Sequence, residues 1–199
     1  MNTLKANLPT SADALAMLIQ GNQRYVDAKL AHPHQTPEHC AALSDAQLPF
    51  AIILGCADSR VPPEIIFDQG LGDLFVIRVA GNLIDDMVLA SIEYAAAHLH
   101  TPLMMVLGHT KCGAVSATLA GGELEGHLPG MASLIQPAIE QTRGQSGDPV
   151  TLAVKAHALA MATQIASAAP VLSELVDAGE LQVVAACYDI DSRKVEILS

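Results

Sequence analysis

The chain has 199 residues, of which 51% are hydrophobic and 16% charged, so it is long and apolar enough to fold around a sizeable core. Its net charge of −11 argues against nucleic acid and anionic membrane surfaces as partners, because both attract basic proteins. No apolar run reaches transmembrane length, and the amino-terminal residues lack the apolar core of a signal peptide, so we expect a cytoplasmic protein.

The amino-terminal segment predicts one helix followed by a loop. Apolar residues recur at helical spacing over residues 12–26, after the capping residues Thr10 and Ser11, and this helix should pack on the domain or on a partner subunit. Residues 31–40 contain three histidines, one cysteine and two prolines. Their spacing matches no metal site, so we interpret them as a solvated loop.

Short apolar runs bounded by proline or glycine predict the strands of a sheet. Such runs are typical of strands buried on both faces of a parallel sheet, and they cover residues 50–54, 74–80, 103–107, 181–189 and 195–198. Helices are predicted between them over residues 64–68, 85–99, 113–120, 131–142, 150–168 and 171–178.

The alternation of strands and helices predicts an α/β fold with a mostly parallel central sheet flanked by helices and an antiparallel strand or hairpin at one edge. We expect a single domain over residues 1–199. Residues 1–45 would form an amino-terminal helical arm and loop, and residues 46–199 would form the α/β core.

Two of the predicted strands are each followed by a glycine and then by a side chain that binds metals. Cys56 follows strand 50–54, and His109 follows strand 103–107. Parallel strands place such residues at one edge of the sheet, where α/β folds bind their ligands. Cys112 completes an H-x-x-C pair at the start of a helix, which favours the thiolate. Two sulfurs and one imidazole are a common ligand set for zinc.

Asp58 and Arg60 lie close to this predicted zinc site in the sequence. Asp58 could occupy the fourth position on the metal, or it could pair with Arg60 and leave that position to water. Because two thiolates and one neutral imidazole cancel the formal charge of zinc, the site should acidify water weakly. We therefore expect activity to favour alkaline pH or to need help from a neighbouring group.

Two motifs give the chain a family resemblance. Cys-Ala-Asp-Ser-Arg at 56–60 and His-Thr-Lys-Cys-Gly at 109–113 resemble the motifs of the β-class carbonic anhydrases. The resemblance extends over most of the chain and includes Gln47, Phe75 to Arg78, Ser91 to Ala95, and Tyr188 to Asp191.

The resemblance implies a zinc lyase, carbonate dehydratase, in which zinc-bound hydroxide attacks carbon dioxide to give bicarbonate and a proton. It implies one zinc per subunit held by Cys56, His109 and Cys112, with Asp58 as a displaceable fourth ligand that pairs with Arg60 when the site is open.

The same resemblance assigns Gln47, Phe75 and Tyr94 to the substrate pocket. In the family, part of the pocket comes from a neighbouring subunit, so a homodimer, or a higher homo-oligomer built from dimers, is expected. The high apolar content agrees, since some of it must be buried between subunits.

The chain departs from the family pattern at two positions. Ile53 stands where some bacterial members have a tryptophan that helps to form a non-catalytic bicarbonate site, so that form of regulation is not expected. Val79 stands where many members have asparagine, which makes that pocket wall less polar. Cys40 and Cys187 are interpreted as buried or idle thiols.

Two other functions remain open from the residues. The first is hydrolysis of carbonyl sulfide or carbon disulfide on the same scaffold, although nothing marks the altered pocket entrance that such an enzyme needs. The second is a non-catalytic zinc protein in which Asp58 holds the metal permanently closed. A Rossmann-type nucleotide binder is excluded because no G-x-G-x-x-G follows a strand.

Overall fold

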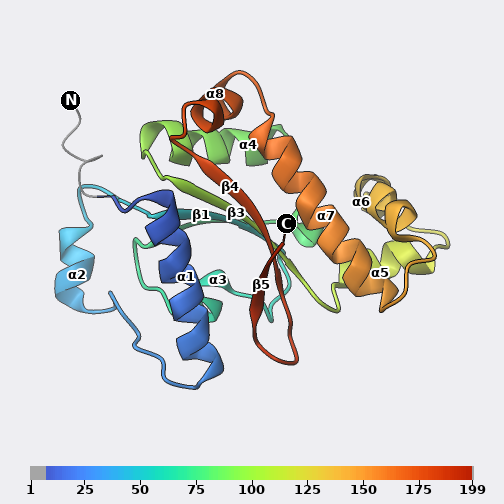
Figure 1. The fold of residues 1–199 in the computed structure, drawn as a ribbon, viewed down its shortest axis with the longest axis horizontal. Helices are drawn as coiled ribbons and strands as arrows, with labels where there is room; N and C mark the ends of the chain where they lie inside the picture. The colour runs from blue at the N-terminus through green and yellow to red at the C-terminus, as the bar shows by residue number, and fades with distance from the viewer. Residues whose placement is uncertain (1–7, 199) are drawn as a thin grey trace.

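A five-stranded sheet in the order β2-β1-β3-β4-β5 organises the computed structural model, which describes residues 8–198 (Figure 1). The strands are β1 (Ala51–Gly55), β2 (Leu74–Arg78), β3 (Leu103–His109), β4 (Gln182–Tyr188) and β5 (Val195–Leu198). The helices are α1 (Ser11–Val26), α2 (Pro37–Ala42), α3 (Pro63–Ile66), α4 (Asp86–Glu93), α5 (Gly113–Ala120), α6 (Leu128–Thr142), α7 (Pro149–Ala166) and α8 (Val171–Asp177). A 3-10 turn, η2 (Ala80–Asn82), follows β2, and a π-helical segment, η3 (Tyr94–His98), follows α4.

The pairing of the strands confirms the predicted fold class. β1 pairs in parallel with both β2 and β3, β3 pairs in parallel with β4, and β5 pairs antiparallel with β4 at one edge. The register places Gly55 opposite Leu107, so β3 continues for two residues beyond the end of β1. The carboxyl ends of the two central strands therefore meet at one edge of the sheet.

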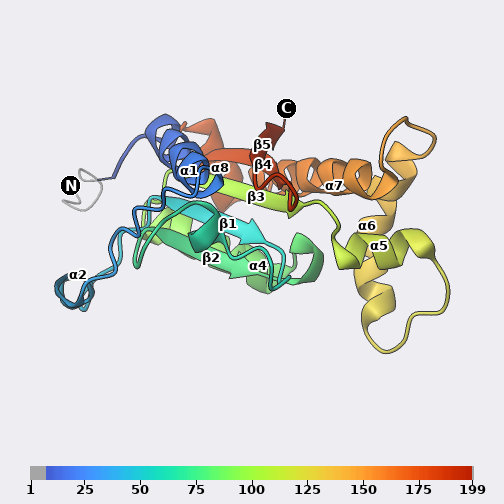
Figure 2. The same ribbon diagram turned by 90° about the horizontal axis from the view of Figure 1, so that it is seen from below.

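Both central strands are buried along their whole length, as the unbroken apolar runs predict. Alternate residues face opposite sides, because the side-chain period of a strand is two. One face of β1 and β3 packs against α1 and α3, through residues that include Ala14, Leu18, Phe67, Ile53 and Met105. The other face packs against α4, α7 and α8, through residues that include Ile92, Ala158, Leu172, Ile52 and Met104. Figure 2 shows α5 and α6 extending beyond the carboxyl end of β3.

Helix α1 packs on its own domain. Thr10 caps it by accepting a hydrogen bond from the backbone N–H of Asp13 at 3.1 Å. A Cβ atom on Gly21 would lie 1.7 Å from the carbonyl oxygen of Phe67, so only glycine allows this close approach of α1 to α3. The next residue, Asn22, is buried and hydrogen-bonds to Ile66 and to the strand β5 region.

One local prediction was wrong, and one predicted helix is present but changes its geometry. Residues 37–40, predicted as loop, begin the short helix α2, because Pro37 suits a first helical position and the Thr36 hydroxyl caps the backbone N–H of His39. The helix predicted over residues 85–99 changes at Tyr94 from α to π geometry, with Leu99 N–H donating to the Tyr94 carbonyl.

Residues 1–7, which bear on the argument against a signal peptide, lie outside the described residues. The cytoplasmic location and the division at residue 45 stay predictions. Within residues 8–198 no single helix is long and apolar enough to cross a membrane, and only α7 and α8, bent by 91° at their junction, pass that test as a pair. Of the four cysteines, all are free, and Cys40 is exposed while the other three are buried.

The surroundings of Gly21 in α1 and of Gly130 in α6 predict opposite effects of an alanine substitution on stability. Gly21→Ala should lower the free energy of unfolding by about 3 kcal/mol or more, because a backbone oxygen cannot move away as a side chain can. Gly130→Ala, in α6 with nothing within 4 Å of the added carbon, should raise it by about 0.5–1 kcal/mol. Urea denaturation at one fixed protein concentration measures both, and a Gly21→Ala protein as stable as the wild type would contradict the packing.

Candidate metal centre

Cys56, His109 and Cys112 come together at the carboxyl ends of β1 and β3. Their two sulfur atoms and one ring nitrogen all lie within 4.8 Å of one another. The three residues are 5%, 1% and 1% exposed, so the cluster is shielded from solvent. Cys112 occupies the N-cap position of α5 with extended backbone geometry. The structure thus brings together all three predicted zinc ligands.

The hydrogen bonding of His109 leaves one ring nitrogen available to a metal. Its Nδ1 lies 2.9 Å from the carbonyl oxygen of Thr110. A carbonyl only accepts, so Nδ1 carries the proton and Nε2 carries the lone pair. Nε2 is one of three buried side-chain polar atoms without a hydrogen-bond partner among the described residues. A buried, unpartnered lone pair beside two sulfurs fits a metal ion.

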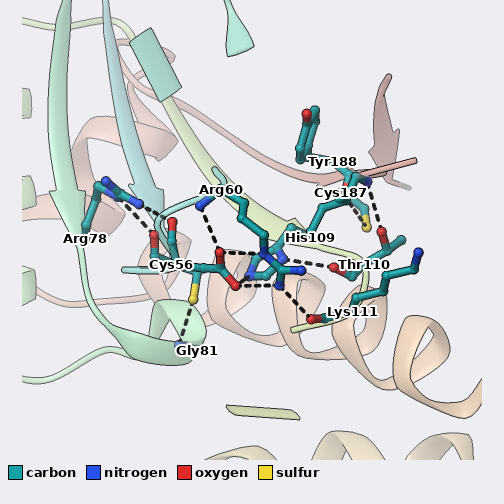
Figure 3. Close-up of polar contacts among 11 residues, drawn as sticks. Cys56, Arg60, Arg78, Gly81, His109, Thr110, Lys111, Cys187 and Tyr188 are labelled. Atoms are coloured by element: carbon teal, nitrogen blue, oxygen red, sulfur yellow. Dashed lines mark hydrogen bonds and ion pairs between the residues drawn. The ribbon is translucent and has the colours of Figure 1, made fainter. Parts of the chain in front are cut away.

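The two thiols influence each other strongly. The hydrogen bond from Cys112, with smaller help from the backbone N–H of Gly81, lowers the pKa of Cys56 to about 4. The Gly81 nitrogen lies 3.4 Å from the Cys56 sulfur (Figure 3). The same hydrogen bond, together with burial, raises the pKa of Cys112. Two sulfurs that share one proton in a buried site are suited to a divalent cation, which lets both ionise.

Asp58 pairs with Arg60 at the edge of the cluster. The guanidinium donates to both carboxylate oxygens, from Nε to Oδ1 at 2.9 Å and from Nη2 to Oδ2 at 2.7 Å. This pairing lowers the pKa of Asp58 to about 2, so the carboxylate is ionised at neutral pH. Arg60 Nη2 also donates to the carbonyl of Lys111 at 3.1 Å, which ties the pair to the segment between the two ligands His109 and Cys112 (Figure 3).

Of the two arrangements that the sequence left open for Asp58, the structure holds the one paired with Arg60. Asp58 Oδ2 nevertheless lies 4.0 Å from His109 Nε2, so the carboxylate borders the cluster of Cys56, His109 and Cys112 but lies outside it.

Two residues that fasten the ligand segments were not singled out from the sequence. Arg78, at the end of β2, donates from Nε to the carbonyl of Cys56 at 3.0 Å and from Nη2 to that of Asp58 at 2.5 Å. Thr110 is fixed to β4, since its N–H donates to the Tyr188 carbonyl and its hydroxyl accepts from Ile190 N–H. The sequence signals for Arg78 were a charged residue within an otherwise apolar run and its place in the family resemblance.

Gln47, Phe75 and Tyr94 do not join this cluster within one chain. Phe75 pairs in register with Ile52 of β1. It lies three residues before Arg78, the last residue of β2, and so about 10 Å from it along the strand. The Tyr94 ring centroid is 6.2 Å from that of Phe75, and Tyr94 is 47% exposed. Gln47 is exposed and precedes β1, at the end of the strand opposite to the cluster.

Comparisons with known proteins agree with this fold and site. Residues 51–195 match the family model described as carbonic anhydrase. Carbonic anhydrase 2 of Mycobacterium tuberculosis is 42% identical over 179 residues, covering 87% of this chain and 86% of the relative. The carbonic anhydrase of Mycolicibacterium smegmatis is 40% identical over 187 residues, covering 92% and 90%.

Solved structures show the same similarity. A tetrameric β-carbonic anhydrase of Sordaria macrospora matches with a TM-score of 0.74 at 25% identity, covering 94% of this chain and 98% of that one. A β-carbonic anhydrase of Aspergillus fumigatus matches with a TM-score of 0.71 at 30% identity, covering 94% and 90%.

The chain belongs to the carbonic anhydrase family, in its β class. It is a zinc-dependent carbonate dehydratase that interconverts carbon dioxide and bicarbonate. All of the relatives named above are carbonic anhydrases, so they give no support to carbonyl sulfide or carbon disulfide hydrolysis or to non-catalytic zinc binding.

The donor cluster predicts which cysteine the metal needs. Cys112→Ser should weaken zinc binding by more than the roughly 100-fold that changes outside the ligand set can cause, because it removes a donor atom. Cys40→Ser, at an exposed thiol on α2, is the matched control and should keep the wild-type zinc content. Zinc analysis of the purified proteins and chelator competition measure both. Zinc retained by Cys112→Ser at the wild-type level would refute the assignment.

Proposed function

We propose that Cys56, His109 and Cys112 hold the catalytic zinc of this carbonic anhydrase, one ion in each chain. The observation that carries the proposal is the convergence of two buried sulfurs on the unpartnered Nε2 of His109. Zinc bound there supplies a Lewis acid that lowers the pKa of water at its open position. The Nδ1 hydrogen bond to Thr110 holds the imidazole in the tautomer that this role requires.

In this proposal, Asp58 positions the attacking water and Arg60 holds Asp58 in place. Because two Arg60 nitrogens and the Arg60 backbone N–H all donate to it, the Asp58 carboxylate is fixed as an ionised acceptor. Its Oδ2 can accept a hydrogen bond from a water molecule beside the cluster and so point that water's lone pair at carbon dioxide. Asp58 Oδ2 lies 4.0 Å from His109 Nε2. Without Arg60, the Asp58 side chain could move across this distance and close the site.

We further propose that the substrate pocket is completed by Gln47, Phe75 and Tyr94 from a second copy of the chain. These residues lie away from the cluster of their own chain, and the Tyr94 ring is half exposed. Met87, near Tyr94 in the sequence, is 72% exposed, which leaves apolar surface for a partner to cover. The tetrameric relative from Sordaria macrospora supports a homo-oligomer built from dimers.

The role of Asp58 predicts a loss of activity without a loss of metal. Asp58→Ala should keep its zinc but lose about 10- to 100-fold in kcat/KM for carbon dioxide near neutral pH, because the water is no longer oriented. Asp191→Asn is the control, since this exposed carboxylate pairs with Lys111 at the edge of the same region and is assigned no role. Stopped-flow hydration assays with zinc analysis measure both. Full activity in Asp58→Ala would remove the proposed role.

The shared pocket predicts complementation between two defective subunits. Cys112→Ser lacks the metal, and the double variant Gln47→Ala/Tyr94→Ala should lose about 10-fold or more in activity because carbon dioxide is poorly positioned. In a mixed dimer, one site receives intact ligands from one subunit and intact pocket residues from the other. Dimers isolated through two different tags should therefore show about half of the wild-type activity.

A pocket formed within one chain predicts the opposite result for these mixed dimers. No mixed dimer would then contain an intact site, and its activity would not exceed the mean of the two parent variants.

A further inference from the structure

His157 lies on α7, outside the ligand set, and makes one buried hydrogen bond toward the metal centre. The residue is 2% exposed, and its Nε2 lies 3.0 Å from the carbonyl oxygen of Gly81. Since a carbonyl only accepts, Nε2 must carry a proton. Burial lowers the pKa of His157, so the ring is held as the neutral Nε2–H tautomer.

Gly81 connects this hydrogen bond to the zinc ligand Cys56. Its own N–H points at the Cys56 sulfur at 3.4 Å, while its carbonyl accepts from His157. The residue adopts φ +72° and ψ 15°, a left-handed conformation that favours glycine. A Cβ atom here would lie 3.2 Å from Ile135 Cδ1, so the turn is also closely packed.

The reach of His157 depends on how closely α7 approaches β3. A Cβ atom on Gly108 would lie 2.9 Å from Val154 Cγ1 and 3.4 Å from Ala158 Cβ, so α7 packs directly against the backbone of β3 at this glycine. Val154, His157 and Ala158 share one helix face through their spacing of three and four residues. The contact at Gly108 therefore sets the position from which His157 meets Gly81.

We propose that His157 is a positioning residue for the metal centre: it fixes the Gly81 turn so that the Gly81 N–H stays on the Cys56 sulfur. The proposal rests on Cys56 being a zinc ligand. An N–H donor withdraws electron density from a thiolate and keeps the thiolate oriented, and such outer contacts tune how tightly a metal is held. His157 would act through Gly81 without touching either the metal or the substrate.

The test compares substitutions that remove or keep the hydrogen-bond donor at position 157. His157→Leu fills the space without a donor and should weaken zinc binding about 10-fold or more, as measured by chelator competition. His157→Gln keeps a side-chain N–H that can reach the Gly81 carbonyl and should recover most of that loss. Ile165→Val, buried on the same helix and away from Gly81, is the control and should bind zinc as the wild type does.

A spectroscopic readout separates this role from a general loss of stability. In the cobalt(II)-substituted proteins, losing the N–H donor raises the energy of the Cys56 sulfur lone pair. The thiolate-to-cobalt charge-transfer band should therefore move to longer wavelength in His157→Leu, and it should stay at its wild-type position in His157→Gln and Ile165→Val.

Three results would overturn the proposal. The first is a His157→Leu protein with the zinc affinity and cobalt spectrum of the wild type. The second is a His157→Gln protein as defective as His157→Leu, which would mean that the ring shape matters and the donor does not. If His157→Leu does not fold, His157→Asn replaces it, because the asparagine side chain is one carbon shorter than that of glutamine and holds its amide further from the Gly81 carbonyl. The third result that would overturn the proposal is then an equal zinc affinity in the Asn and Gln variants.

Discussion

The parallel pairing of β1 with β3 is the constraint on which the site depends. β1 ends at Gly55 and β3 runs two residues further, so Cys56 and His109 arrive at the same point although 53 positions separate them. The strands on either side then fasten the two ligand segments. Arg78, at the end of β2, donates to the carbonyl of Cys56, and the Tyr188 carbonyl, at the end of β4, accepts from the N–H of Thr110. A sheet with another strand order would separate the donors.

The site concentrates positive charge in a chain that has little of it. Lysine and arginine total 10 against 21 acidic residues, yet two arginines act around one turn of about five residues. Arg60 neutralises the Asp58 carboxylate, and Arg78 donates to backbone carbonyls of the same turn. Both guanidinium groups use their fixed fork of donors to hold two acceptors at once, which lysine cannot do in this geometry. These hydrogen bonds hold the turn that carries Cys56 in place.

Much of this could be predicted from the sequence, and the reasons for success are local. Apolar runs closed by glycine identified the strands that bear Cys56 and His109, and the H-x-x-C spacing added Cys112. The choice between the two arrangements of Asp58 needed coordinates, because two residues beyond a strand the side chain can turn either way.

Other features could not be predicted because they depend on tertiary contacts. Helix α7 is apolar on most sides, so its sequence pattern does not reveal which face meets β3 or that His157 reaches Gly81. The π geometry at Tyr94 has no residue signature, and α2 forms in a segment whose prolines suggested loop. Phe75 and Tyr94 were chosen through the family resemblance alone, and the shared pocket to which they are assigned extends beyond a single chain.

Asn22 joins the two ends of the chain in a way that bears on how the protein is made. Its amide donates to the carbonyls of Ile66 and Arg193 and accepts from the N–H of Val195, a residue 173 positions later. Helix α1 thus cannot complete its hydrogen bonds to the β5 region until that strand has been synthesised. The apolar face of α1 can pack on α3 and β3 earlier, but the Asn22 contacts close last, and contacts of such long sequence separation form slowly during folding.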